Sequence, residues 1–227
     1  MNLKFNQNLL DNFTCFSSLT PEEKMLVQAN AHYSQQSKNK KIFCKGEVCT
    51  RLYFITKGSI KTHTTDAKSR KEHINSIEHS GDIFGECCLF GSKTKSFDST
   101  TLEEDTRYFS IDINLFRKLM NSNFEFNLAV LEMIGNKMQK ARERLIDFAT
   151  KDARSRIVEF LKLNAEVVGL KVGYETLVRH GLTQQDIAIY TGTSRQTVTT
   201  VLNDLKKSNQ IFLRRKSILI RDVSSLN

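Results

Sequence analysis

Residues 183–207 read TQQDIAIYTGTSRQTVTTVLNDLKK, with a capping residue at the start and another near the middle. Thr183 stands three residues before Asp186, which is the spacing of a helix capping box with Asp in place of the usual Glu or Gln. Gly192 interrupts the apolar run where a tight turn needs a residue without a Cβ atom. Ser194 is suited to cap the next helix. The stretch therefore predicts two short helices joined by a tight turn.

The second of these helices has two faces of different chemistry. At 100° per residue the apolar side chains fall within one arc, and they are Val198, Val201, Leu202 and Leu205. The opposite face is polar at its start and basic at its end, and it comprises Gln196, Thr200, Asn203 and Lys207, flanked by Arg195 and Thr199. A face of this kind fits the major groove of DNA, with its first side chains against base edges. The pattern indicates a helix-turn-helix DNA reader; the alternative is an ordinary solvated amphipathic helix.

The composition bounds the class of protein. The chain has 227 residues, 39% of them hydrophobic, which is enough for two globular domains. Its formal net charge is +9, and residues 150–227 hold 13 Lys and Arg against 7 Asp and Glu, so the positive charge is concentrated with the predicted reader. No apolar run is long enough for a membrane span and no signal peptide is recognisable, so we expect a cytoplasmic protein without a membrane partner. Five cysteines, an odd number, favour free thiols in a reducing compartment.

The N-terminal half is predicted to be mainly β-structure after a short helical lead-in over residues 1–37, in which Thr20 and Pro21 begin a helix. Short β-prone pieces separated by glycines follow, namely Lys41–Phe43, Leu52–Thr56, Ser59–Thr64, His73–Ile77 and Tyr108–Ile111. Such spacing is typical of an antiparallel barrel or sandwich. A Gly-Glu step at Gly85 and Glu86 leads into a possible short helix whose amides would suit an anion.

A long helix is predicted over residues 124–149. Its apolar residues recur at spacings of 4 and 3, as in a coiled-coil seam: Asn127, Leu131, Ile134, Met138, Ala141, Leu145 and Phe148. We expect a two-fold dimer seam formed by Leu131, Ile134, Met138, Ala141, Leu145 and Phe148, and the alternative is a helix buried against its own domain. A dimer would place two readers on two half-sites.

The C-terminal region contains a further amphipathic helix over Lys151–Asn164 and ends in a predicted strand pair. Ile211–Leu213 and Ile218–Ile220 flank the three adjacent cations Arg214, Arg215 and Lys216. A cationic hairpin tip is commonly solvated, but beside a reader helix it also fits a wing that touches DNA phosphates.

The order of these elements resembles the cyclic-AMP receptor protein and fumarate-nitrate regulator (Crp/Fnr) family of bacterial transcription factors. The residues that carry the resemblance are Leu52–Ile60 (LYFITKGSI), Gly81–Glu86 (GDIFGE) and Gly192–Val198 (GTSRQTV). It implies an α+β fold with a cyclic-nucleotide-binding-like β-roll (double-stranded β-helix) in residues 1–111. A dimerisation helix and hinge in 112–149 and a winged helix-turn-helix in 150–227 would follow. It also implies a homodimer that binds near-palindromic double-stranded DNA and meets RNA polymerase.

Carried over by position, the base-contacting residues fall on Arg195, Gln196 and Thr200, with Thr199 alongside. The whole DNA-binding set that we predict is Thr183, Ser194, Arg195, Gln196, Thr199, Thr200, Asn203, Lys207, Arg214, Arg215 and Lys216. Many relatives have Glu in place of Gln196 and Arg in place of Thr200. Since that Arg is a strong guanine reader, we expect an operator richer in A·T pairs than the family consensus.

The effector region departs from the cyclic-nucleotide binders of the family. Gly85 and Glu86 keep the step that holds the ribose hydroxyl, but the position of the phosphate-binding Arg is Ser96, and Asp98 would repel a phosphate. Lys93 or Lys95 would substitute only if the loop shifts. We therefore expect an unidentified small-molecule effector rather than cyclic AMP, and its candidate contacts are Phe84, Gly85, Glu86, Cys87, Cys88, Ser96 and Phe97.

No metal or resident cofactor is predicted. The N-terminal segment holds only Cys15, and Cys44 and Cys49 lack the spacing of iron–sulfur ligands. The adjacent Cys87 and Cys88 fit either a thiol switch or small buried hydrophobes. The histidines, His32, His63, His73 and His79 among them, fall in no haem-binding motif.

No catalytic triad or Walker-type loop is recognisable, so we predict a transcription regulator rather than an enzyme. The competing hypothesis is a ligand-binding regulatory module that acts on a protein partner through its C-terminal third. The cationic wing and the groove-suited helix face favour DNA.

Overall fold

The computed structural model describes residues 7–214 and 216–227, so Arg215 of the predicted wing lies outside the described residues. The chain divides into two compact units. One comprises the described residues up to Thr64 together with Ile77–Ala141, and the other comprises Thr65–Ser76 together with Arg142–Asn227. The predicted α+β architecture of β-roll, long helix and C-terminal helix-turn-helix is confirmed.

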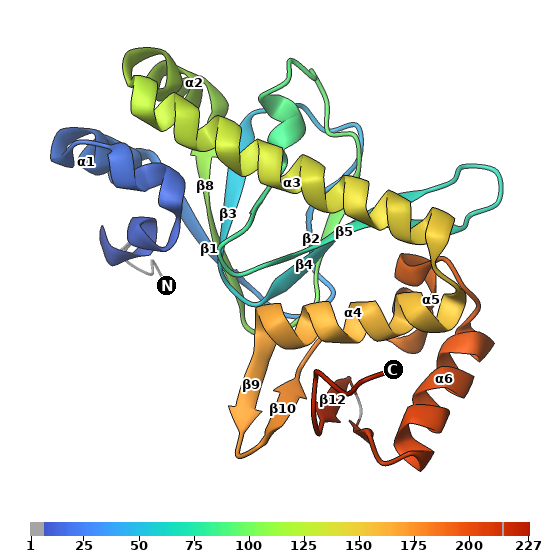
Figure 1. Ribbon diagram of the computed structural model, residues 1–227. Coiled ribbons are helices and arrows are strands. Elements are labelled where there is room, and N and C mark those ends of the chain that lie inside the picture. The colour runs from blue at the N-terminus through green and yellow to red at the C-terminus, as the bar shows by residue number, and fades with distance from the viewer. Residues whose placement is uncertain (1–6, 215) are drawn as a thin grey trace. The chain divides into compact units, whose positions relative to one another are not determined.

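Two sheets form the β-roll, which lies mostly in the first unit (Figure 1). One sheet has the order β1-β8-β3-β6 and the other the order β2-β7-β4-β5. The strands are β1 (His32–Gln36), β2 (Lys41–Phe43), β3 (Arg51–Lys57), β4 (Ser59–Thr65), β5 (Glu72–His79), β6 (Ile83–Phe84), β7 (Asp98–Thr101) and β8 (Thr106–Asp112). β3 and β8 pair antiparallel with Phe54 opposite Phe109, and both rings are fully buried. This is the predicted β-roll.

Three short helices precede β1, namely η1 (Gln7–Asn12), η2 (Thr14–Ser18) and α1 (Pro21–Asn30). The predicted start of α1 is confirmed, because the Thr20 hydroxyl accepts the Glu23 amide and the Glu23 carboxylate accepts the Thr20 amide. The lead-in predicted to run to residue 37 was wrong at its end, where His32–Gln36 form β1 against β8. β1 and β7 were missed because their residues are largely polar and show no apolar alternation.

The hydrophobic core of this unit lies between the roll and the helices. Phe54 and Phe109 stack with centroids 4.8 Å apart, and Phe13 packs edge-on against both rings. The long helix α3 (Phe124–Thr150) inserts Phe126, Val130 and Ile134 into the same core. The first half of α3 is therefore fixed to the β-roll by apolar burial.

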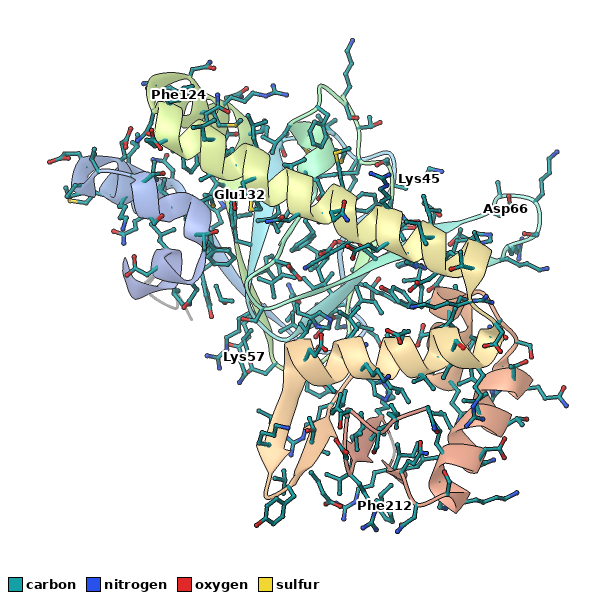
Figure 2. The ribbon with its side chains drawn as sticks, viewed as in Figure 1. Lys45, Lys57, Asp66, Phe124, Glu132 and Phe212 are labelled. Carbon is teal, nitrogen blue, oxygen red and sulfur yellow. The ribbon has the colours of Figure 1, made fainter. Side chains whose placement is uncertain are left out.

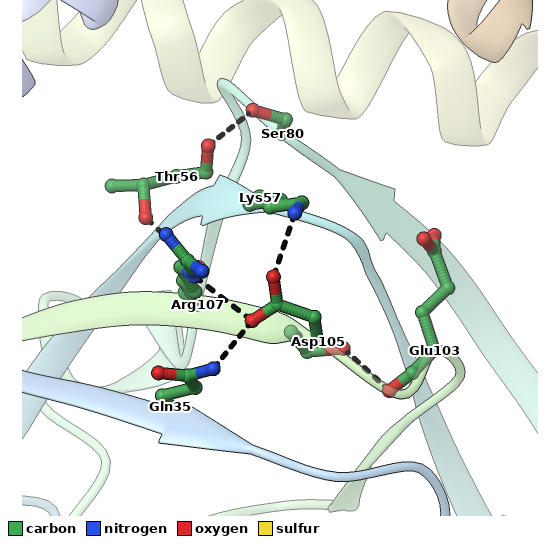
Figure 3. A network of polar contacts seen from close by, with 8 residues as sticks. Gln35, Thr56, Lys57, Ser80, Glu103, Asp105 and Arg107 are labelled. Atoms are coloured by element: carbon green, nitrogen blue, oxygen red, sulfur yellow. Dashed lines mark hydrogen bonds and ion pairs between the residues drawn. The ribbon is translucent and has the colours of Figure 1, made fainter.

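A polar cluster at one end of the roll ties three strands together (Figure 3). The Asp105 carboxylate accepts hydrogen bonds from Lys57 at 2.6 Å, Arg107 at 2.8 Å and Gln35 at 2.7 Å. The hydrogen bonds from Arg107 and then Lys57 lower the pKa of Asp105 to about 2. The cluster holds the turn before β8 in register with β1 and β3.

Residues 112–149, for which a hinge and a long dimerisation helix were predicted, contain two helices. α2 (Ile113–Ser122) ends at Asn123, which has an extended backbone, and the Asn123 carboxamide oxygen accepts the Phe126 amide to begin α3. α3 matches the range predicted for the long helix.

One face of α3 stays apolar and exposed. Leu131, Met138 and Leu145, seven residues apart, are 56%, 69% and 68% exposed, and Ala141 is exposed between them. Leu128 and Phe124 extend this stripe toward the start of the helix, where Figure 2 labels Phe124. Of the predicted seam, Ile134 instead lies in the core, because it sits on the face of α3 that meets the roll.

The second unit contains α4 (Ala153–Val168), α5 (Gln184–Thr191), α6 (Arg195–Lys207) and a sheet of order β11-β12-β10-β9. Its strands are β9 (Gly169–Val172), β10 (Glu175–Val178), β11 (Ile211–Arg214) and β12 (Ser217–Ile220). The predicted wing pair is confirmed, with Ile211 opposite Ile220. The β9–β10 hairpin was missed, and it completes the sheet that carries the wing. None of the helices within the described ranges is long and apolar enough to cross a membrane.

The turn between α5 and α6 depends on Gly192. Its backbone is left-handed, with φ of +63°, and its amide donates to the last carbonyls of α5. A Cβ atom at this position would lie 2.6 Å from the Phe148 ring. Glycine is therefore required both for the backbone conformation and for the close approach of α3's last turns.

We predict that Gly192→Ala destabilises the protein by about 2–4 kcal/mol, since left-handed strain and the clash with Phe148 add. Gly173→Ala is the matched control, because Gly173 has a φ of +62° but open space around its Cβ position. It should cost only about 1 kcal/mol. Urea unfolding of both variants measures the difference, and equal losses would show that the Phe148 contact contributes nothing.

Candidate functional site

The polar face of α6 is exposed because its opposite, apolar face is buried. Val198, Val201, Leu202 and Leu205 are all buried, as the sequence pattern predicts. α6 begins at the Ser194 cap, whose hydroxyl accepts the Thr197 amide at 3.0 Å. Burial and capping therefore fix both the rotation and the start of the helix.

Five side chains on the outer face of α6 are exposed and make no hydrogen bond or ion pair with any residue in the described part of the chain. They are Arg195, Gln196, Thr200, Asn203 and Lys207. Unengaged donors and acceptors on one rigid face are available to base edges and phosphates. The only carboxylate on the flank, Asp204, lies 3.8 Å from the Arg154 guanidinium, so its charge is partly offset.

Three other predicted DNA-binding residues are already engaged within the protein. The Thr183 hydroxyl and amide both bond to the Asp186 carboxylate, which completes the predicted capping box. The Thr199 hydroxyl lies 2.7 Å from the Gln184 carboxamide oxygen, so it joins α6 to α5. With Ser194, these residues hold the two helices in place rather than present free groups.

Two cations of the wing, Arg214 and Lys216, are at least partly exposed. Arg214 is exposed and its guanidinium stands 5.7 Å from the Phe212 ring, which is itself 47% exposed and labelled in Figure 2. Lys216 is half-exposed at the tip, in a left-handed conformation. Arg214 thus has its charge available to phosphate.

The C-terminal part of α3 that belongs to this unit contacts the end of α5, next to the turn of the helix-turn-helix. Arg144 donates to the Tyr190 carbonyl at 2.8 Å and stacks on the Tyr190 ring. Arg156 of α4 donates to the Thr191 carbonyl at 2.8 Å, and both guanidinium groups lie 5.5 Å from the Phe148 ring. The two guanidinium groups therefore satisfy carbonyls at the end of α5, and they join α5 to α3 through Arg144 and to α4 through Arg156.

In the first unit, the Gly-Glu step is tied to α3 by a partly buried ion cluster. The Lys137 ammonium lies 2.9 Å from the Glu78 carboxylate and 3.0 Å from that of Glu86, and it donates to the Ile83 carbonyl. Burial raises the pKa of Glu78 although Lys137 opposes that rise, and the two carboxylates raise the pKa of Lys137. The second oxygen of Glu86 is buried and has no hydrogen-bond partner among the described residues.

The space beside Gly85 is occupied by Lys95. This side chain is 2% exposed, and its ammonium lies 4.5 Å from the Phe43 ring centroid and 4.9 Å from that of Tyr53. A Cβ atom on Gly85 would lie 2.8 Å from the same ammonium. The cation that sequence reasoning allowed only after a loop shift is thus already inside the roll.

The other predicted effector contacts differ in how far they are buried. Phe84 is fully buried and stacks on Tyr53, so it is core rather than a free contact. Ser96, at the position of the family's Arg, is exposed, and Phe97 is half-buried against Phe43. Cys87 and Cys88 form the 3-10 turn η3 (Glu86–Cys88) directly after Gly85.

Sequence reasoning missed Lys137 and Glu78 because they lie far apart in the chain and in no motif. The sequence offers little indication of either residue. Lys137 directly precedes Met138 of the predicted dimer seam, and the sequence does not show that its side of α3 packs against the roll. Leu128 was also missed, although it stands three residues before Leu131 on the exposed stripe.

Two family profiles match the chain. That of the cyclic nucleotide-binding domain matches residues 35–123, and that of the Crp-like helix-turn-helix domain matches residues 155–227. The chain is 30% identical over 185 residues, 82% of either protein, to the CRP-like cAMP-activated global transcriptional regulator of Mycobacterium tuberculosis. It is 25% identical to the global nitrogen regulator of a Nostoc species, over 84% of this chain and 85% of the relative.

Solved structures share the fold. FixK2 from Bradyrhizobium japonicum matches with a TM-score of 0.76 at 18% identity, over 86% of this chain and 95% of that protein. A CooA mutant from Carboxydothermus hydrogenoformans matches with a TM-score of 0.69 at 26% identity, over 87% of each chain.

We predict that Lys137→Met destabilises the protein by about 3–5 kcal/mol, because it leaves two carboxylates at a partly dry site without their cation. Lys140→Met, at an exposed position one turn onward, should change stability by less than about 0.5 kcal/mol. Without the opposing cation, burial raises the pKa of Glu78 in the folded state further above its unfolded value. The loss is therefore largest above that pKa and shrinks as the pH falls through it. Urea unfolding at several pH values tests this, and a pH-independent loss would contradict the electrostatic cause.

Proposed function

The chain belongs to the Crp/Fnr family of transcription regulators, and we propose that it acts as a homodimer that reads a near-palindromic operator in double-stranded DNA. The observation that carries the proposal is the set of five unengaged side chains on the exposed face of α6. Their helix is preorganised by its cap and its buried face. Binding therefore costs little conformational freedom beyond that of these five side chains.

The positions on α6 assign different tasks to these residues. Arg195 and Gln196 stand in the first turn, where a recognition helix meets base edges: Arg suits guanine O6 and N7, and Gln suits adenine N6 and N7. Thr200 is one turn further on and offers only a hydroxyl and a methyl group. Lys207, at the end of the helix, suits phosphate. We infer an operator richer in A·T pairs than that of relatives with Arg at the position of Thr200.

Dimerisation through α3 is the second part of the proposal. Leu131, Met138 and Leu145 form a seven-residue repeat on the solvent side of the helix, and a second copy of the same helix would cover it. Such a pair places two α6 helices on two half-sites and doubles the phosphates that the protein can reach. Family members meet RNA polymerase, and we extend this expectation to the present chain.

The effector is proposed to differ from the cAMP named for the tuberculosis relative. Ser96 brings no guanidinium to the phosphate position, Lys95 fills the space beside Gly85, and Glu86 is already ion-paired with Lys137. A cyclic phosphate would have to displace a buried ammonium that is held by a carbonyl and two rings.

The competing function is that of a module that docks on a protein partner. The dependence of binding affinity on salt concentration distinguishes this function from DNA binding. DNA binding releases counterions, so the affinity must fall steeply with salt, whereas a largely neutral protein contact would respond little. The unengaged Arg195, Lys207 and Arg214 favour DNA.

We predict that Gln196→Ala costs about 1–3 kcal/mol of operator affinity and relaxes preference at one base position per half-site. Lys207→Ala is the comparison on the same helix: it should weaken binding to all sequences alike and lower the slope of log K against log salt by about 1 for each phosphate that Lys207 neutralises. Selection from a randomised duplex library, followed by mobility shifts over a salt series, measures both. If the two variants behaved identically, direct readout by Gln196 would be refuted.

We predict that Met138→Asp weakens the dimer by about 2 kcal/mol or more, a 30-fold rise in its dissociation constant, because two carboxylates would enter an apolar seam. Asn136→Asp adds the same charge on another side of α3 and should leave the dimer intact. Sedimentation equilibrium against the 26.1 kDa chain mass reports the association. A monomeric wild-type protein at micromolar concentration would refute the dimer.

A further inference from the structure

Three thiols from two separate loops meet in the first unit. Cys49 lies between β2 and β3, whereas Cys87 and Cys88 belong to η3. The sulfur atoms of Cys49 and Cys87 are 3.9 Å apart, and all three sulfurs lie within 4.8 Å of one another. All three are free cysteines. The sequence did not reveal this group, because 38 residues separate Cys49 from Cys87.

The spacing of the sulfurs matches the coordination shell of a metal ion. Thiolates bound to Zn²⁺ at about 2.3 Å in tetrahedral geometry lie about 3.8 Å from one another, as follows from the tetrahedral angle. The separation of 3.9 Å between Cys49 and Cys87 is close to that edge. Cys88 needs at most a small adjustment to complete the face of the tetrahedron, because it is within 4.8 Å of both.

A buried cation stands beside the thiols without an acidic partner. The Lys95 ammonium lies 3.0 Å from the Cys88 sulfur and donates to the Arg51 carbonyl at 2.9 Å. Within the described residues it forms no ion pair with a carboxylate. Since a buried ammonium needs a compensating negative charge, the position of Lys95 is explained if the sulfurs are thiolates.

The charges favour a divalent ion. Three thiolates and one divalent cation sum to −1, and the ammonium of Lys95 brings the cluster to zero. A monovalent ion such as Cu⁺ would leave one uncompensated negative charge. Hydrogen bonds, first that from Cys87 and then that from Lys95, lower the pKa of Cys88, whereas the Cys88 contact and burial raise the pKa of Cys87. The thiols lose their protons to solvent as the ion binds.

We propose that Cys49, Cys87 and Cys88 bind one thiophilic divalent ion of the zinc class, with Lys95 as its charge partner. Binding forms three metal–sulfur bonds and releases protons, and no oxidant or reductant is required. The fourth coordination position stays open to water or to another small ligand.

The site adjoins the Gly-Glu step. Glu86 begins the same turn that carries Cys87 and Cys88, and its carboxylate is paired with Lys137 of α3. An ion at the thiols would therefore stiffen the segment that contacts α3. An effect on operator affinity rests on the proposed regulator function, whereas binding of the ion does not, so the two are measured separately.

The binding test uses the full chain, reduced and kept free of oxygen. Zn²⁺ is titrated in competition with a chromophoric chelator, and Cd²⁺ serves as a probe because its thiolate charge-transfer absorption counts metal–sulfur bonds. We expect one ion per chain and an absorption that corresponds to three thiolates. The Cd²⁺ count on the unaltered protein keeps the test valid even if a cysteine variant unfolds.

Variants locate the ion. Cys49→Ser and Cys87→Ser should each weaken Zn²⁺ binding by about 100-fold or more, and Lys95→Met by about 10-fold to 100-fold as the neighbour that balances charge. Cys44→Ser is the matched control, since Cys44 is a half-exposed cysteine outside the group, and it should bind as the wild type does. Circular dichroism melts of every variant separate a failure to bind from a failure to fold.

Several results would overturn the proposal. These are equal Zn²⁺ affinity in Cys49→Ser and Cys44→Ser, a Cd²⁺ absorption of fewer than three thiolates, or retention of Cu⁺ with no retention of Zn²⁺. Formation of a Cys49–Cys87 disulfide in a protein whose reduced form binds no Zn²⁺ would likewise refute it. Operator mobility shifts with and without Zn²⁺ then test the regulatory role alone, and a failure there leaves the binding result standing.

Discussion

The half-buried ammonium of Lys137 is the contact on which the arrangement of the first unit depends. It neutralises Glu78 from β5 and Glu86 from the Gly-Glu step, and it caps the Ile83 carbonyl of β6. Apolar burial of Phe126, Val130 and Ile134 brings α3 to the roll, but burial is not directional. The ion cluster fixes which turn of α3 faces which loop, because a slip by one residue would separate the Lys137 ammonium from both carboxylates.

In the cyclic-nucleotide binders that this family includes, the Gly-Glu step serves a ligand. Here the same carboxylate serves the protein's own helix, and the adjacent cavity space is taken by the ammonium of Lys95. A fold can be retained while its binding chemistry changes, and the proposed change of effector rests on Lys95 and Lys137. At the proposed metal site, the three sulfurs beside Lys95 would supply the negative charge that its buried ammonium needs.

Much of the fold was predictable because its signals are local. The caps at Thr183 and Ser194, the glycine at the turn and the apolar arc of α6 can all be read within a few residues, and each is confirmed. β1 and β7 were not predictable, since both consist largely of polar residues that become strands only by pairing with β8, β2 and β4. The β9–β10 hairpin was missed for a related reason: it is short and largely exposed.

The site was predictable in part for the same reason. The exposed face of α6 follows from helical periodicity, but the pattern cannot tell which polar side chains are free. In the sequence, Thr199 and Gln196 are both polar residues on or beside the same helix face. Only packing shows that the Thr199 hydroxyl donates a hydrogen bond to the Gln184 carboxamide oxygen. The meeting of Cys49 with Cys87, and of Lys137 with Glu78, depends on long-range topology and leaves no trace in spacing.

The difference between the internally bonded hydroxyls and the unengaged side chains of the helix-turn-helix has a consequence for engineering its binding specificity. Because Thr183, Ser194 and Thr199 are spent on internal bonds while Arg195, Gln196, Thr200 and Asn203 are not, the second group can be exchanged without disturbing the scaffold. A library randomised at those four codons, with the three structural hydroxyls kept, would sample binding specificity while leaving the stability of the unit nearly constant.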